Sequence, residues 1–316
     1  MSTACSLLQI AGEYDREFSM SDYEGAQARW CSGCGDHSVL ASMQRLLADE
    51  NLPPEQTVFV SGIGCSSRFP HYMSTYGFHG IHGRALPIAT GVKLHRPELN
   101  VFVVMGDGDC MSIGAGHWVH SMRYNVDMVA LLLDNQIYGM TKKQTSPTTP
   151  EGYASNTQPG GSYLPPINPI MASLGIANAS FVAQTAEWIP PHQQAVLEAA
   201  FNHPGFSFVR IMQRCPHFTD DMFTEEIQNQ DRVQMLVHPD GVETPELASR
   251  WKDRLEHDPS DLQEARRLAG DESTMRLGIF YRNDALTTYD DRRLVSAHTV
   301  EEKMAILDAE LDRYAV

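Results

Sequence analysis

Short apolar runs recur along this chain between amphipathic or polar segments. Four of them span residues 57–61 (TVFVS), 101–105 (VFVVM), 128–133 (MVALLL) and 206–212 (FSFVRIM). They are too short for helices and consist largely of β-branched or bulky apolar residues, as buried parallel strands do. The run at 179–183 predicts a further strand of this kind.

Helical patterns fall between the predicted strands. An amphipathic helix before the first strand is indicated by apolar residues at helical spacing, namely Val39, Leu40, Met43, Leu46 and Leu47. Asp36 would cap this helix, and further helices are predicted through Ala89 and Val92, at 168–174 and at 193–201. Alternating strands and helices predict an α/β fold with a doubly wound, mostly parallel sheet, in which ligands bind outside the carboxyl ends of the strands.

Changes in composition and periodicity divide the chain into three parts. Residues 1–28 lack periodicity and are expected to form a mobile or wrapping N-terminal arm, and residues 29–240 form the main domain. Residues 241–316 are charged on both signs and predict an irregular C-terminal extension that packs on the main domain or on a partner subunit. Short helices are expected there around 246–256, 260–269 and 300–311, and the apolar patch at 277–281 is its only compact one.

The stretch from 101 to 137 has the pattern of a strand–turn–helix–strand crossover. Gly106-Asp107-Gly108-Asp109 follows the first strand, and Asn135 follows the second. A glycine-rich turn at a helix N-terminus suits a phosphate, and a carboxylate with an amide oxygen suits Mg²⁺. The turn is not a dinucleotide-binding fingerprint, because Met111 stands where its third glycine would be. The long irregular stretch at 138–166 is expected to be functional.

Four of the six cysteines are predicted to gather at one edge of the sheet. Cys31 and Cys34 form a CxxC pair, Cys65 follows the first strand, and Cys215 follows the last. A four-thiolate site suits either zinc or an iron–sulfur cluster. Because the third and fourth thiols come singly from distant strand ends, the pattern favours a redox cluster. The two remaining cysteines, Cys5 and Cys110, are given no role.

Charge and hydropathy narrow the class of protein. The 316 residues include 40 acidic and 24 basic side chains, for a net charge of −16, which argues against nucleic acid as a partner. No membrane span and no secretory leader is evident, so a cytoplasmic location is expected, with no membrane partner. An acidic redox partner would need a local basic patch or another subunit to dock on.

Several motifs together resemble one family. WCSGCGDH, SGIGCSSRFP, HGIHGR, GDGD, DNQIYGMTKKQ and the late Arg-Cys-Pro are similar, in order over roughly residues 25–240, to the β subunits of 2-oxoacid:ferredoxin oxidoreductases. The resemblance implies one 4Fe–4S cluster on Cys31, Cys34, Cys65 and Cys215. It also implies thiamine diphosphate with Mg²⁺ held by Asp107, Asn135 and the backbone carbonyl of Ile137. The implied cofactor contacts are Ile63, Gly64, Cys65, Ser66, His82, Gly106, Gly108, Asp109, Gly139, Met140 and Thr141.

The same resemblance implies an activity. It is the oxidative decarboxylation of a 2-oxoacid with coenzyme A, with electrons passing through the cluster to ferredoxin; the reverse, reductive carboxylation, would serve a reductive TCA cycle. An α subunit would supply the domain that faces the thiamine pyrimidine, in an αβ or α2β2 assembly, so the chain alone should be inactive. The SSRFP and YGFHGIHGR stretches look most like the 2-oxoglutarate type, and Arg68 is expected to bind the substrate carboxylate.

Three other readings remain open. The first is a β subunit for pyruvate or for a broad range of 2-oxoacids. The second is a zinc-stabilised nucleotide-binding module, which would contain one zinc ion rather than iron and sulfide. The third is a non-redox thiamine diphosphate carboligase or decarboxylase, which would have no use for the four cysteines.

Overall fold

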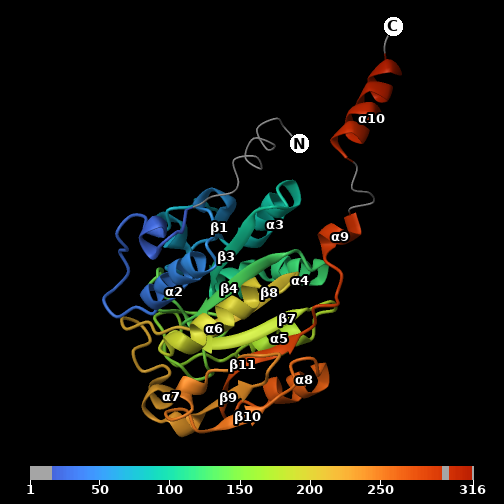
Figure 1. Ribbon diagram of the computed structural model, residues 1–316. Coiled ribbons are helices and arrows are strands. Elements are labelled where there is room, and N and C mark those ends of the chain that lie inside the picture. The colour runs from blue at the N-terminus through green and yellow to red at the C-terminus, as the bar shows by residue number, and fades with distance from the viewer. Residues whose placement is uncertain (1–15, 294–298, 315–316) are drawn as a thin grey trace.

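One nine-stranded sheet organises the computed structural model, which describes residues 16–293 and 299–314 (Figure 1). The strand order is β10-β9-β11-β7-β8-β4-β3-β1-β2, and every neighbouring pair is parallel except β11 with β7. The strands are β1 (Thr57–Ser61), β2 (Tyr76–His79), β3 (Asn100–Gly106), β4 (Met128–Asp134), β7 (Phe181–Ala186), β8 (Phe206–Met212), β9 (Val233–Val237), β10 (Arg254–Glu256) and β11 (Met275–Arg282). The predicted α/β class with a mostly parallel sheet is confirmed.

Helices cover both faces of this sheet (Figure 1). One face packs against α2 (Asp36–Asp49) and α6 (Pro190–Phe201). The other packs against α3 (Ala85–His95), α4 (Ala115–Tyr124), α5 (Pro169–Leu174) and α8 (Leu262–Gly270). The remaining elements are α7 (Thr224–Gln228), α9 (Tyr289–Arg293), α10 (Val300–Asp312), the two-stranded pair β5 (Ile137–Tyr138) and β6 (Gln144–Thr145), and several short 3-10 and π turns.

The central strands are apolar throughout because they are buried on both faces. In β3, Val101 and Val103 lie in one core, while Phe102 and Val104 lie in the other. Phe59 of β1 stacks between Phe69 and Phe102, with ring centroids 5.5 and 5.1 Å apart. This packing on both faces fixes the positions of β1, β3, β4 and β8 along the strand direction. It therefore also fixes where the loops after their carboxyl ends begin.

Most of the predicted core elements are confirmed, with two local corrections. β1 and β8 have the predicted bounds, and the predicted helices at 168–174 and 193–201 correspond to α5 and α6. Asp36 does not cap its helix: Gly35 is the N-cap, and the Asp36 side chain is buried behind it. β2 was not predicted, because its four residues are all exposed at the sheet edge and carry no buried pattern.

The segment after 240 is more regular than the sequence predicts. The apolar patch at 277–281 is the centre of β11, which pairs with β7 on one side and β9 on the other. The helix predicted around 246–256 is wrong: a 3-10 turn (Pro245–Leu247) and the edge strand β10 occupy that stretch. The helices predicted around 260–269 and 300–311 are confirmed as α8 and α10. The domain boundary at 240 stays a prediction.

The two ends of the described chain differ in how they pack. Most of the predicted arm, residues 1–15, lies outside the described residues; of the rest, Tyr23 is fully buried, and its hydroxyl lies 2.7 Å from the carbonyl of Leu52. At the other end α10 stands apart from the sheet, and residues 301–314 are all exposed (Figure 1). Within the described part of the chain, no helix combines the length and apolarity needed to cross a bilayer.

Removing the C-terminal segment tests the role of β11. Ending the chain after Asp240 removes the buried side chains of Leu277, Ile279 and Phe280, each worth about 1.5–3 kcal/mol, and leaves β7 paired with β8 alone, as a new edge strand. We expect no cooperative melting transition by circular dichroism. Ending the chain after Arg293, which removes only the exposed α10 and its linker, should leave the melting temperature within a few degrees. Equal melting of both would show that β11 is dispensable.

Candidate functional site

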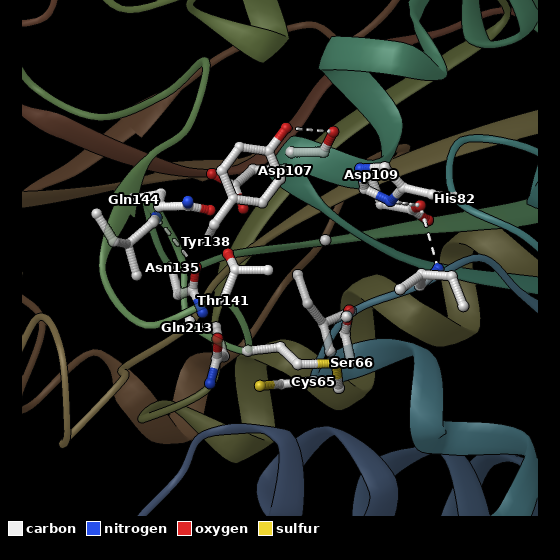
Figure 2. A pocket seen from close by; sticks show the side chains of 18 residues that line it. Cys65, Ser66, His82, Asp107, Asp109, Asn135, Tyr138, Thr141, Gln144 and Gln213 are labelled. Atoms are coloured by element: carbon white, nitrogen blue, oxygen red, sulfur yellow. Dashed lines mark hydrogen bonds and ion pairs between the residues drawn. The ribbon is translucent and has the colours of Figure 1, made fainter. Parts of the chain in front are cut away.

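The carboxyl ends of β1, β3, β4 and β8 lie side by side and open into a cavity of about 430 Å³, here called the cofactor pocket (Figure 2). Parallel neighbours release their loops at the same edge, so four segments far apart in sequence converge there. The residues predicted to contact a cofactor all line it: Ile63, Gly64, Cys65, Ser66, His82, Gly106, Gly108, Asp109, Gly139, Met140 and Thr141. Asp107, Asn135 and Ile137 line it as well.

Four lining residues were not anticipated from the sequence: Leu133, Tyr138, Gln144 and Gln213. Tyr138 is the most informative, because its hydroxyl donates to the carbonyl of Gly108 at 3.1 Å. A Cβ at Gly108 would lie 2.1 Å from the Tyr138 ring, so only glycine fits beneath that ring. The sequence offered a signal for Tyr138, since it directly follows the predicted Ile137.

Asp109 fixes the loops on one side of the pocket. Its Oδ1 accepts hydrogen bonds from the backbone amides of Gly83 (2.7 Å) and Ile63 (3.2 Å), and His82 Nδ1 lies 2.8 Å away (Figure 2). A Cβ at Gly62 would lie 2.0 Å from Asp109 Oδ2. Burial raises the pKa of Asp109, while the two amides and His82 act in the opposite direction. Asp109 is therefore an anchor for the loops at 63 and 83.

Asp107 is buried beside a second carboxylate. Its Oδ2 accepts from the hydroxyl of Thr148 at 2.7 Å, and the same hydroxyl lies 2.8 Å from Asp134 Oδ1. Burial, and after it the Asp134 charge, raises the pKa of Asp107 well above its usual range. Asp134 is paired with Arg210, whose Nη2 is 2.6 Å away. Arg210 compensates the charge of Asp134, and a further cation could compensate that of Asp107.

The four predicted cysteines surround a second, smaller cavity of about 90 Å³, here called the cysteine pocket. Cys31, Cys34, Cys65 and Cys215 line it, together with Trp30, whose indole N–H donates to the carbonyl of Cys65 at 2.7 Å. Burial, and then the charges of Asp36 and the neighbouring thiols, raises the pKa of Cys65 to about 11. Cys110 lies elsewhere in the core, and Cys5 is outside the described residues.

The two cavities share a wall. Cys65, Asn135 and Gln213 line both of them. In Figure 2 Asp107 and Tyr138 lie toward one end of the cofactor pocket, and Cys65 with Ser66 lies toward the other. A molecule in the cofactor pocket would therefore reach from the buried carboxylate to the edge of the cysteine pocket.

The spacing of the thiols bears on the kind of metal centre. Four thiolates on one zinc ion would place their sulfur atoms about 3.8 Å apart, given a Zn–S distance of about 2.3 Å in a tetrahedron. Within residues 16–293 and 299–314, no group of three or more His, Cys, Asp or Glu side chains is arranged to hold a single metal ion. Four thiols around one cavity are also the ligand set of an iron–sulfur cluster, which contains several metal ions.

Arg68 lies on the loop after Cys65, beside the cysteine pocket. It lines the cysteine pocket and is not among the residues that line the cofactor pocket. Its guanidinium carbon is 5.9 Å from the centre of the Tyr72 ring, and Nη1 is 3.5 Å from the carbonyl of Arg29. The 3-10 turn Ser66–Tyr72 has about three residues per turn, so Ser66 and Arg68 point in different directions. The contact between Arg68 and a substrate carboxylate stays a prediction.

Comparisons with known proteins agree with this geometry. Residues 62–211 match the family model for the C-terminal TPP binding domain of thiamine pyrophosphate enzymes. The chain is 48% identical over 197 residues to the 2-oxoglutarate oxidoreductase subunit KorB of Mycobacterium tuberculosis, an alignment that covers 62% of this chain and 52% of that relative. It is 39% identical over 269 residues to 2-oxoacid:ferredoxin oxidoreductase 1, subunit beta, of Aeropyrum pernix, covering 83% of this chain and 80% of that one.

A solved structure is similar over nearly the whole chain. It is the 2-oxoglutarate:ferredoxin oxidoreductase from Magnetococcus marinus with 2-oxoglutarate, coenzyme A and succinyl-CoA bound. The TM-score is 0.80 at 32% identity, and the match covers 94% of this chain and 97% of that one.

Proposed function

The chain belongs to the family of 2-oxoacid:ferredoxin oxidoreductase β subunits, and from that premise we propose that it is the β subunit of a 2-oxoglutarate:ferredoxin oxidoreductase. The reaction would convert 2-oxoglutarate and coenzyme A to succinyl-CoA and CO₂, with two electrons leaving one at a time for ferredoxin, and it would be reversible. The observation that carries the proposal is the wall of Cys65, Asn135 and Gln213 shared by the two pockets. The choice of 2-oxoglutarate rests on the names of the relative from Mycobacterium tuberculosis and of the similar structure from Magnetococcus marinus.

The cofactor pocket fits thiamine diphosphate with Mg²⁺. Bound thiamine diphosphate supplies a carbanion centre and an electron sink for cleaving a 2-oxoacid. In this chain the diphosphate would lie against the Gly106–Asp109 turn, with Mg²⁺ held by Asp107, Asn135 and the carbonyl of Ile137. The fit is supported by the burial of Asp107 beside Asp134, where a second negative charge is unfavourable unless a cation joins it. Ile63 and Met140 add apolar side chains to the lining of the same pocket.

The cysteine pocket would hold one 4Fe–4S cluster on Cys31, Cys34, Cys65 and Cys215. Cys65 lines both pockets. Its thiolate would therefore link the cluster directly to the wall of the cofactor pocket, and electrons could pass through it. Gln213 Nε2 donates a hydrogen bond to Cys34 Sγ at 3.3 Å. A non-redox thiamine diphosphate enzyme leaves the four-thiol cavity unexplained, and a zinc module leaves unexplained why that cavity shares a wall with the cofactor pocket.

An α subunit would complete the site. Apolar side chains are exposed at the mouth of the cofactor pocket or next to it in sequence: Ile63, Met140 and Ile81 are 37%, 48% and 69% exposed. Apolar side chains in such a place favour a covering partner. The assembly would be αβ or α2β2, it would act in the cytoplasm, and ferredoxin would take the electrons outside the cysteine pocket.

The function is tested by purifying the chain anaerobically with its α subunit and assaying ferredoxin reduction with coenzyme A and several 2-oxoacids. We expect kcat/KM for 2-oxoglutarate to exceed those for pyruvate and 2-oxobutyrate by at least tenfold. In the same panel Arg68→Met should lower all three values by a similar factor, because Arg68 lines the cysteine pocket. Equal use of the three acids by the wild type would instead identify a broad-specificity enzyme, and no activity with any would overturn the proposal.

Asp107→Ala tests the magnesium assignment. It removes the only carboxylate among the three proposed Mg²⁺ ligands, so thiamine diphosphate binding measured by calorimetry in the presence of Mg²⁺ should be lost. The iron content should remain that of the wild type, because Asp107 does not line the cysteine pocket. An unchanged affinity for the cofactor would contradict the assignment.

Cys215→Ser tests the cluster assignment. With one of four thiolates replaced, the iron and sulfide content should fall and the EPR signal should weaken or change to that of a smaller cluster. Cys110→Ser is the matched control, since this thiol is buried in the core away from the cavity. A Cys215→Ser protein with full iron content and the wild-type spectrum would show that Cys215 is not a ligand.

A further inference from the structure

Thr148 lies at the junction of the metal-binding turn and the sheet interior. Its side chain is 1% exposed, and its Oγ1 is 2.7 Å from Asp107 Oδ2 and 2.8 Å from Asp134 Oδ1. Thr148 belongs to the long loop after β5, so it reaches both carboxylates from a segment outside the sheet. No sequence motif marks it, and it does not line the cofactor pocket.

The hydrogen-bond donors around the two carboxylates can be counted. Asp134 receives Nε and Nη2 of Arg210 on Oδ2 and the backbone amide of Gln136 on Oδ1 at 3.1 Å. The hydroxyl of Thr148 has one hydrogen to donate. Because Asp134 is already supplied by Arg210 and Gln136, the Thr148 hydrogen is available to Asp107. That contact is made to Oδ2 of Asp107, and the Ser146 side chain and the Gly108 backbone also bond to this carboxylate.

The groups behind Thr148 are themselves held in place. Arg210 Nη1 donates to Gln184 Oε1 at 3.0 Å, and Gln184 Nε2 donates to the carbonyl of Arg276 at 2.8 Å. The row Asp134, Arg210, Gln184 and Arg276 therefore crosses four adjacent strands, β4, β8, β7 and β11. A hydroxyl fixed by such a row can hold a carboxylate in one orientation.

We propose that Thr148 is a positioning residue that orients the Asp107 carboxylate toward the Mg²⁺ of bound thiamine diphosphate. The inference rests on the proposed function for the identity of the cation. Thr148 touches neither substrate nor cofactor, and it acts only through Asp107. Its effect should therefore appear in the amount of Mg²⁺ needed for cofactor binding rather than in the choice of 2-oxoacid.

The neighbouring Thr149 provides a matched control. It is also 1% exposed and lies in the same loop, where its hydroxyl donates to the carbonyl of Gln136 at 2.6 Å and accepts from the amide of Ser146 at 2.8 Å. Thr149 therefore holds the loop without touching Asp107. If Thr148 also served only to hold the loop, the two valine variants would behave alike.

The experiment uses the αβ complex, stripped of Mg²⁺ and thiamine diphosphate by chelation. Calorimetry with thiamine diphosphate gives the Mg²⁺ concentration for half-maximal binding in the wild type, Thr148→Val, Thr148→Ser and Thr149→Val. Losing a hydrogen bond to a charged group should raise that concentration about tenfold or more in Thr148→Val. Thr148→Ser should stay within about twofold of the wild type, and so should Thr149→Val even if its melting temperature falls.

Three results would overturn the inference. One is a Thr148→Val protein that needs no more Mg²⁺ than the wild type, and another is an equal rise in Thr149→Val. The third is a wild-type complex whose cofactor binding does not depend on Mg²⁺. This result would overturn the proposed function as well, and the wild-type titration alone reveals it. Should Thr148→Val not fold, Thr148→Ala removes the same hydroxyl with less bulk, and the same criteria apply.

Discussion

Two buried carboxylates, Asp107 and Asp134, lie together at the carboxyl edge of the sheet, but Arg210 pairs with Asp134, and the rest of the site depends on this imbalance. A buried charge without a partner is costly, so such a pair is stable when one member is neutralised or when a cation joins it. Arg210 forms an ion pair with Asp134, whereas Asp107 lines the cofactor pocket. The proposed Mg²⁺ would supply such a cation at Asp107, beside the turn proposed to hold the diphosphate.

The parallel sheet explains why the two proposed centres are neighbours. β1 ends in the loop with Cys65, β4 ends at Asn135, and β8 ends just before Cys215, so a single edge supplies both pockets. The antiparallel strand β11 completes the far side of this arrangement. Through Arg276 and Gln184 it reaches Arg210, so a segment that looked peripheral in sequence supports the metal turn from behind. This connection gives the C-terminal part of the chain a role in the site without any contact with the cofactor.

The convergence of residues could be predicted from the sequence wherever it followed from strand ends. Asp107, Asn135 and the four cysteines each lie directly after a predicted strand or in the CxxC motif, and the fold brings them to the two pockets. Thr148 could not be found, because its position depends on how a long loop folds back. The place of Arg68 at the cysteine pocket depends on the 3-10 turn after Cys65, which the sequence did not reveal. β10 was missed because it has three residues and lies at an edge, where no buried pattern is required.

The central claim is that the two pockets form one pathway from substrate to cluster. The most direct measurement is EPR of the anaerobic αβ complex, loaded with thiamine diphosphate, Mg²⁺ and iron, after 2-oxoglutarate and coenzyme A are added without ferredoxin. The account predicts that a reduced 4Fe–4S signal appears on adding substrate and is missing when 2-oxoglutarate is omitted. A cluster that is intact, reducible by dithionite and yet unchanged by substrate would contradict it.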